Sequence, residues 1–118
     1  MTNRERATTP EDLTRLFVER ANEGDFEGIA ELYEPEAAMA YPVGQLTVGR
    51  AAIGALFARA LAGRPHFEQE ELLPTVRSGD LALTSTAPKD DAGARAQVAR
   101  LQSDGTWLRV LDQPEFRR

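Results

Sequence analysis

The sequence predicts an α+β fold in which three N-terminal helices pack on a curved, mostly antiparallel sheet. In the first half of the chain, apolar residues recur every three or four positions, the spacing of an amphipathic helix. From about residue 67 the spacing changes to two, which is typical of strands with one buried face. Turn signals at residues 78–80 and 103–105 divide this second half into short, hairpin-connected strands.

The length of the chain suits one compact domain. Its 118 residues leave no room for two hydrophobic cores, and 42% hydrophobic with 28% charged residues are proportions that build a single core. We expect a flexible N-terminal arm over residues 1–8, one domain over residues 9–114 and a C-terminal tail over residues 115–118.

Composition excludes several classes of function. A net charge of −5 argues against nucleic acid and against an anionic membrane surface, both of which require a basic face. The chain has no cysteine and a single histidine, His66, so we expect no metal site and no cofactor. The first nine residues contain no apolar run and no stretch is long enough to cross a bilayer, so a cytoplasmic location is expected.

Three helices are predicted from their caps and apolar faces. The first begins near Thr9 and ends at Gly24, the second follows Asp25 and ends at Pro35, and the third runs over residues 50–62. The predicted faces are Leu13, Leu16, Phe17 and Ala21; Phe26, Ile29, Leu32 and Tyr33; and Ile53, Leu56, Phe57, Ala60 and Leu61.

The predicted strands cover residues 37–41, 45–48, 67–76, 81–86, 95–102 and 106–112, with a polar loop at residues 88–93. Because the helices cannot bury their faces on one another alone, the sheet must curl around them. A sheet curled around helices leaves a conical cavity, which is a natural place for a small molecule.

The order of several short motifs resembles a known family. A Gly24-Asp25 corner joins the first two helices, Tyr41-Pro42-Val43-Gly44 ends a strand, and Gly49-Arg50 opens a helix. Residues 103–107 and 111–114 continue the pattern. Over residues 10–114 the chain resembles the SnoaL-like and ketosteroid-isomerase-like branch of the NTF2-like superfamily, whose SnoaL-like members include many bacterial proteins. This resemblance implies a cone-shaped fold with an internal cavity.

The positions that match the catalytic groups of ketosteroid isomerase hold other residue types. The resemblance places Tyr41 where the isomerase has its aspartate base, Phe17 at a tyrosine donor, and Gln97 near a neutral carboxylic acid. A phenol is a poor base at neutral pH, and phenylalanine cannot stabilise an oxyanion. We therefore expect no appreciable isomerase activity, and whether the protein is an enzyme stays open.

Helical faces and strand alternation nonetheless predict a ligand pocket. Asp112 is expected to share the face of Leu108 and Val110; it is either a cavity acid or base, or a strand-end carboxylate paired with Arg100 or Arg109. Tyr41 is either a packing aromatic or a hydroxyl that orients a ligand. The predicted pocket residues are Phe17, Met39, Tyr41, Phe57, Gln97, Val110 and Asp112.

The single tryptophan bears on assembly. Alternation places Trp107 with Arg109 and Leu111, on the outer face of the sheet if Asp112 faces inward. An outer tryptophan would need cover, which a homodimer joined through the sheets would supply; the alternative is that Trp107 anchors the core.

Three functions remain open on sequence alone. The first is a binding domain whose cavity holds a small apolar or lightly oxygenated molecule. The second is a cofactor-free enzyme, such as a polyketide cyclase, isomerase or hydratase-like protein, that uses Tyr41 and Asp112. The third is a sheet-mediated dimerisation or assembly domain.

Overall fold

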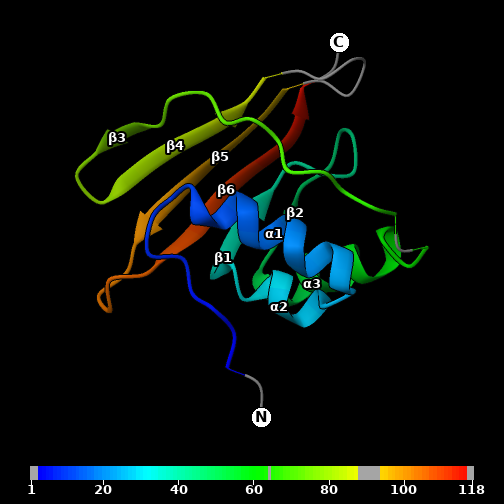
Figure 1. Cartoon of the computed structure of the whole chain (residues 1–118). Coiled ribbons are helices and arrows are strands. Elements are labelled where there is room, and N and C mark those ends of the chain that lie inside the picture. Colours follow the sequence, from blue (N-terminus) through cyan, green and yellow to red (C-terminus); the bar gives the residue numbers. More distant parts are fainter. Residues whose placement is uncertain (1–2, 64, 88–93, 117–118) are drawn as a thin grey trace.

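A computed structural model describes residues 3–63, 65–87 and 94–116 of the chain. Within these residues, three helices lie against one face of a six-stranded sheet (Figure 1). The helices are α1 (Asp12–Glu23), α2 (Phe26–Ala30) and α3 (Arg50–Ala60). The strands are β1 (Tyr33–Met39), β2 (Thr47–Val48), β3 (Val76–Ser78), β4 (Leu81–Thr86), β5 (Ala94–Leu101) and β6 (Trp107–Phe116). The predicted α+β class is therefore confirmed.

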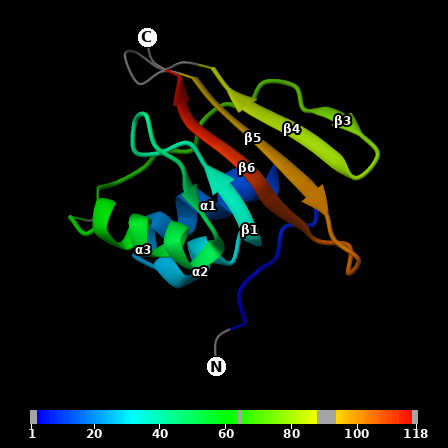
Figure 2. The same cartoon turned by 180° about the vertical axis from the view of Figure 1, so that it is seen from behind.

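The sheet has the strand order β2-β1-β6-β5-β4-β3. Only the β1–β6 pair is parallel, and the other pairs described are antiparallel. The polypeptide therefore enters the sheet beside its own last strand, which places the end of β1 next to Asp112. Seen from the side away from α1, the sheet is strongly twisted (Figure 2).

Local signals correctly place α1 and the start of α2. The Thr9 hydroxyl accepts a hydrogen bond from the Asp12 N–H (3.2 Å), and Gly24 ends α1 with φ of 73°. Asp25 caps α2 by accepting from the Gly28 N–H at 3.0 Å. Residue 24 needs glycine because that left-handed backbone conformation is strained for other residues.

The boundary between α2 and β1 differs from the prediction. The helix ends at Ala30 rather than at Pro35, and Tyr33 begins a strand instead of completing a helical face. Pro35 lies within β1, where the pairing with β6 shifts between Tyr33 and Ala38. A proline donates no backbone hydrogen bond, so it is tolerated where the ladder is already interrupted.

The long strand expected over residues 67–76 is also absent from the described structure. Only Val76–Ser78 pairs as β3, with one further isolated bridge between Leu72 and Thr86. The backbone of Phe67 instead bonds to the Asn22 side chain on α1, with Phe67 N–H to Oδ1 at 2.8 Å and Nδ2 to the Phe67 carbonyl at 2.9 Å. Contacts with α1 thus replace the expected ladder.

The last strands agree more closely with the sequence. Strand β4 has the predicted bounds, β5 begins and ends one residue earlier, and β6 runs to Phe116 rather than stopping at Asp112. Residues 115–116 of the expected tail therefore belong to a strand. Residues 117–118 and the predicted loop over residues 88–93 lie outside the described residues.

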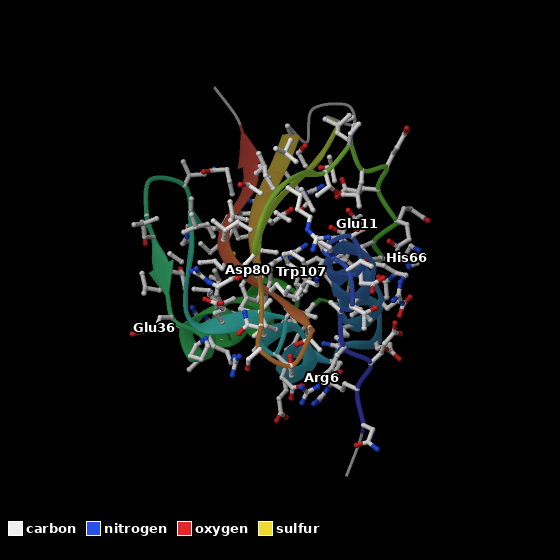
Figure 3. All side chains as sticks on the ribbon, turned by 90° about the vertical axis from the view of Figure 1, so that its left-hand side faces the viewer. Arg6, Glu11, Glu36, His66, Asp80 and Trp107 are labelled. Carbon is white, nitrogen blue, oxygen red and sulfur yellow. The ribbon has the colours of Figure 1, made fainter. Side chains whose placement is uncertain are left out.

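A bulge in β6 overturns the predicted orientation of Trp107. Val98 pairs with Leu111 and Ala99 pairs with Arg109, so Val110 is an extra residue between two ladder positions. Alternation resets there, and Trp107, Arg109 and Asp112 are all buried while Leu111 is 52% exposed. Trp107 is a core residue between the sheet and α1, not an outer one (Figure 3).

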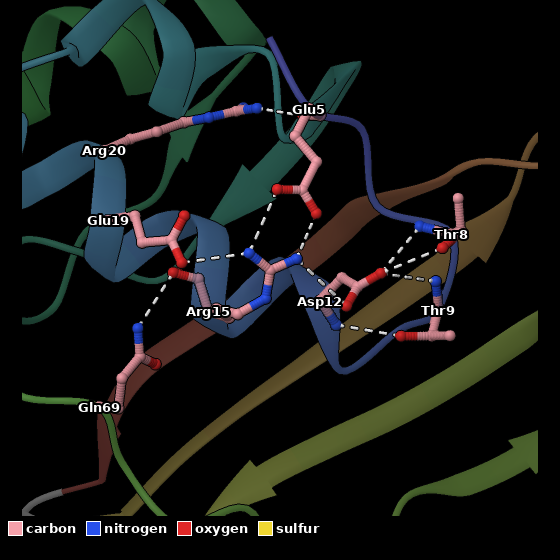
Figure 4. Close-up of polar contacts among 8 residues, drawn as sticks. All are labelled: Glu5, Thr8, Thr9, Asp12, Arg15, Glu19, Arg20 and Gln69. Carbon is pink, nitrogen blue, oxygen red and sulfur yellow. Dashed lines mark hydrogen bonds and ion pairs between the residues drawn. The ribbon is translucent and has the colours of Figure 1, made fainter.

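Residues 3–8, expected as a flexible arm, pack against the domain. Ala7 is buried, and its carbonyl accepts a hydrogen bond from the Trp107 N–H at 2.9 Å. The Arg20 guanidinium bonds to the carbonyl of Glu5, whose carboxylate pairs with Arg15 on the same helix (Figure 4). The segment therefore continues the core at the start of β6.

Candidate functional site

A cavity of about 580 Å³ lies between the concave face of the sheet, helices α1 and α3, and the segment that follows α3. That volume is within the usual range for small-molecule sites. The side chains that line it are Thr14, Phe17, Val18, Met39, Tyr41, Leu56, Phe57, Ala60, Leu61, His66, Phe67, Glu68, Glu70, Thr86, Arg95, Gln97, Arg109, Asp112 and Pro114.

The structure brings most of the predicted pocket residues together. Phe17, Met39, Tyr41, Phe57, Gln97 and Asp112 all line the cavity. Val110 does not line it, because Val110 is the extra residue of the β6 bulge. Asp112 faces inward as expected, but it shares that face with Arg109 rather than with Val110.

Asp112 is the acceptor at the centre of a buried hydrogen-bond network. The Tyr33 hydroxyl donates to Asp112 Oδ2 at 2.5 Å, and Gln97 Nε2 donates to Asp112 Oδ1 at 3.1 Å. The Thr84 hydroxyl in turn donates to Gln97 Oε1 at 3.4 Å. Cross-strand pairing of Thr84 with Gln97, and of Gln97 with Asp112, places these three side chains in one row across the sheet.

Arg109 supplies the positive charge beside this carboxylate. Its Nη1 lies 3.9 Å from Asp112 Oδ2 and 3.4 Å from the Tyr33 hydroxyl, and the Arg109 and Asp112 side chains are both almost fully buried. The guanidinium also lies over the rings of Phe17 (5.7 Å) and Tyr33 (5.8 Å). A buried carboxylate thus has a compensating charge and donors on both oxygens.

Tyr33 is fixed as a hydrogen-bond donor in this network. Burial raises the pKa of its hydroxyl far above the ordinary value, and the neighbouring Asp112 carboxylate raises it further. The phenol therefore keeps its proton and donates a hydrogen bond to the Asp112 carboxylate.

Aromatic rings form the apolar part of the cavity. Phe17 packs edge to face on Phe57, with ring centroids 5.3 Å apart, and on Phe67 at 6.2 Å. Tyr33 lies 6.4 Å from Phe57 on the other side. The three phenylalanines come from α1, α3 and the segment after α3, so the cavity exists only once these elements have packed together.

One polar group of the cavity has no protein partner among the described residues. The Thr86 hydroxyl is buried and makes no hydrogen bond there. An unpaired buried hydroxyl costs folding free energy, because folding removes its water partners without replacing them.

Charged side chains surround the mouth of the cavity. Arg95 forms an ion pair with Glu70, and the more exposed His66 lies 3.1 Å from Glu68. The described part of the chain contains no group of three or more His, Asp or Glu residues placed to hold a metal ion. None of the described helices has the length and hydropathy required to cross a membrane.

Sequence reasoning missed Tyr33 and Thr86, and it named Arg109 as a possible partner of Asp112 but predicted the wrong face for it. Tyr33 was assigned to a helix and Arg109 to the outer face, because the start of β1 and the β6 bulge leave no clear local signal. Thr86 could have been found, since the alternation of β4 places it on the face of Ala82 and Thr84.

Comparison with known proteins identifies the family. The model of the SnoaL-like domain matches residues 14–110. The chain belongs to the SnoaL-like domain family. Its fold is similar to that of NTF2-like proteins of known structure, and the resemblance to the SnoaL-like branch seen in the motifs is confirmed.

This SnoaL-like domain also matches individual proteins. It is 37% identical over 62 residues, 52% of the chain, to epoxide hydrolase LasB from Streptomyces lasalocidi, and the match spans only 22% of that relative's length. Among solved structures it is similar to a candidate calcium/calmodulin-dependent protein kinase type II association domain from Thiobacillus denitrificans (TM-score 0.73, 20% identity, 96% of this chain and 100% of that one). A ketosteroid isomerase-like protein from Erwinia carotovora atroseptica gives a TM-score of 0.64 at 16% identity, covering 87% of this chain and 89% of that one. At these identities, the structural matches establish the fold alone.

Proposed function

We propose that this SnoaL-like domain binds a small, largely apolar molecule with few oxygen or nitrogen atoms in the cavity. The observation that carries the proposal is the Thr86 hydroxyl, which has no partner among the described residues, in a cavity where Phe17, Phe57 and Phe67 form a continuous apolar wall. A ligand that covers the phenylalanine rings would remove their apolar surface from water. If the ligand also bonded to the Thr86 hydroxyl, it would satisfy a buried polar group.

The charges of the cavity narrow the ligand class. The lining contains three carboxylates, on Glu68, Glu70 and Asp112, against the guanidinium groups of Arg95 and Arg109. Both guanidinium groups already face carboxylates within the protein. This balance favours a neutral molecule over a phosphate or another strongly anionic one.

Binding of a neutral aromatic probe tests the proposal. N-phenyl-1-naphthylamine should bind with a rise in fluorescence, and Ala60→Trp should weaken its affinity at least about tenfold because the indole would occupy the cavity. Ala55→Trp is the matched control, since Ala55 is exposed on the same helix and does not line the cavity. Thr86→Val should weaken binding about fivefold through loss of one hydrogen bond. Equal affinities in all four proteins would place the probe elsewhere.

A cofactor-free enzyme is the second candidate, favoured by the position of Asp112 and by the partial match to an epoxide hydrolase. A carboxylate has about four acceptor sites, and protein donors take two on Asp112. In epoxide opening, a water oxygen would attack a ring carbon, the carbon–oxygen bond would break, and its electron pair would pass to the ring oxygen. Asp112 would take the proton of the water, and Tyr41, which also lines the cavity, would protonate the ring oxygen and regain a proton through solvent.

The rate of styrene oxide hydrolysis tests whether the protein is an epoxide-opening enzyme. Asp112→Asn should lower kcat by about 10²–10⁴-fold, the usual contribution of a general base. Tyr41→Phe should lower it less, because water can also protonate the ring oxygen. If the unaltered protein does not hydrolyse styrene oxide, epoxide opening is not its reaction.

The protein should not isomerise 3-oxo-Δ5 steroids at an appreciable rate.

The outer face of the sheet supports a homodimer. One transverse row of aliphatic side chains crosses all six strands in register, namely Val48, Ala38, Leu111, Val98, Leu83 and Val76. Four of these six are more than 40% exposed, and a hollow beside Leu46, Leu83 and Leu111 adds to the apolar surface. We propose that a second copy of the chain covers this face (Figure 2).

Light scattering at micromolar concentration measures the oligomeric state. The mass should be twice the 13.0 kDa of one chain. The double variant Leu83→Lys, Leu111→Lys should have the mass of one chain, because dimerisation would desolvate the two introduced charges of each chain at the interface. Ala55→Lys, on the exposed side of α3, should leave the dimer intact. A monomeric unaltered protein would contradict the proposal.

A further inference from the structure

A second, polar pocket shares no lining residue with the cavity described above. It has a volume of about 600 Å³ and is formed by the N-terminal segment, the first residue of α3 and the hairpin between β5 and β6. We call it the arginine pocket, because it is lined by Arg4, Arg6, Arg20 and Arg50, together with Asn3, Glu5, Ala7, Glu31, Leu32, Gln102, Ser103, Asp104, Thr106, Trp107 and Leu108.

The carboxylates of the arginine pocket are already paired. Glu31 lies 2.8 Å from Arg4, which also forms a two-point contact with Asp25. Asp104 lies 2.9 Å from Arg6 and accepts hydrogen bonds from Thr106, and the Glu5 carboxylate turns away to Arg15. These carboxylates therefore do not neutralise the two remaining arginines by direct contact.

Arg50 is held in place by one nitrogen and keeps two others free. Its Nε donates to the Tyr33 carbonyl at 2.8 Å, while its two terminal nitrogens make no hydrogen bond or ion pair with any residue that the structure describes. The side chain is half-buried, so it has less water around it than a fully exposed arginine. A guanidinium fixed at one edge presents its other edge in the planar geometry that carboxylate and phosphate oxygens fit.

Arg20 adds a second positive charge without a carboxylate in contact. It is buried, and its terminal nitrogens donate to the carbonyls of Gly28 (2.7 Å) and Glu5. Carbonyl acceptors satisfy its hydrogen bonds, and the carboxylates of Asp25, Glu31 and Glu5 act on its charge only through space. Burial accordingly lowers the pKa of Arg20 from its ordinary value.

We propose that the arginine pocket binds a small oxyanion, a phosphate or a carboxylate group, on the two free nitrogens of Arg50. Arg20 contributes positive potential, and the hydroxyl of Ser103 is a further donor on the rim. The lining carries four arginines against three carboxylates, and none of its residues lines the apolar cavity. The site is therefore separate from the one proposed for an apolar ligand.

Thermal unfolding in inorganic phosphate tests this inference. Compared with sodium chloride at equal ionic strength, phosphate at ten times its Kd should raise Tm by about 5 °C. The rise should be lost in Arg50→Gln, which keeps an amide near the Tyr33 carbonyl but removes the charge. It should persist in Arg59→Gln, the matched control, because Arg59 is exposed on the same helix and outside the pocket.

A titration with succinate in parallel distinguishes the two kinds of oxyanion. Stabilisation by phosphate alone indicates a phosphate site, and stabilisation by both indicates that a carboxylate also fits. Should Arg50→Gln fail to fold, amide chemical shifts of the unaltered protein in phosphate decide the question, because they should change around Arg50, Ser103 and Thr106. No phosphate-specific rise in Tm, a rise kept in folded Arg50→Gln, or shift changes confined to other residues would overturn the proposal.

Discussion

Replacing Asp112 by alanine is expected to lower the free energy of unfolding by about 3–5 kcal/mol. The substitution removes the acceptor of Tyr33 and Gln97 and leaves Arg109, which is 4% exposed, as a buried charge without its carboxylate. The Asp112 and Arg109 side chains are both almost fully buried, so water replaces the lost contacts only in part. Urea unfolding followed by the fluorescence of Trp107 measures the loss.

A double variant separates the cost of the orphaned charge from that of the lost packing. Asp112→Leu with Arg109→Met removes both charges, and it should recover much of the stability lost in Asp112→Ala because apolar groups replace a buried ion pair at little net cost. A loss below about 1 kcal/mol in Asp112→Ala would mean that the network contributes little. Equal losses in the single and double variants would mean that charge is not the cause.

Replacing Trp107 by alanine is expected to cost about 3–5 kcal/mol, the usual range for a large aromatic in a core. Trp107 is 2% exposed and Arg77 lies over its ring at 4.8 Å, whereas the bond from its backbone N–H to the Ala7 carbonyl would be kept by alanine. The change would leave a cavity where β6, β3 and the N-terminal segment meet. Chemical denaturation followed by far-ultraviolet circular dichroism measures the loss, since the variant has no tryptophan.

The stabilities of Trp107→Phe and Leu111→Ala are the controls for the loss expected in Trp107→Ala. Phenylalanine keeps part of the packing and should cost less than alanine, whereas Leu111 is 52% exposed and its replacement should change the stability of one isolated chain by less than about 0.5 kcal/mol. If Trp107→Ala left stability unchanged while altering only the oligomeric state, the tryptophan would belong to an interface and its burial in the core would be wrong.

The sequence by itself determined the elements whose signals are local. Thr9 and Gly24 bracket α1, and the alternation from Leu81 to Thr86 gave β4 its bounds. These signals act within a few residues, because a cap needs only its own turn and alternation needs only one strand. The family followed from the order of such short motifs. Phe17 and Phe57 were placed on the cavity by helical spacing in the same way.

The tertiary structure decided the features that depend on pairing between distant segments. The slip of β6 against β5 makes Val110 a bulge, which turns Trp107 and Arg109 inward together with Asp112. Tyr33 joins the same network because β1 pairs in parallel with the last strand of the chain. Register between strands is a property of two segments and of the core they enclose, so one segment's sequence does not fix it. The buried Tyr33–Asp112–Arg109 cluster is therefore assembled by the fold, although each of its residues is visible in the sequence.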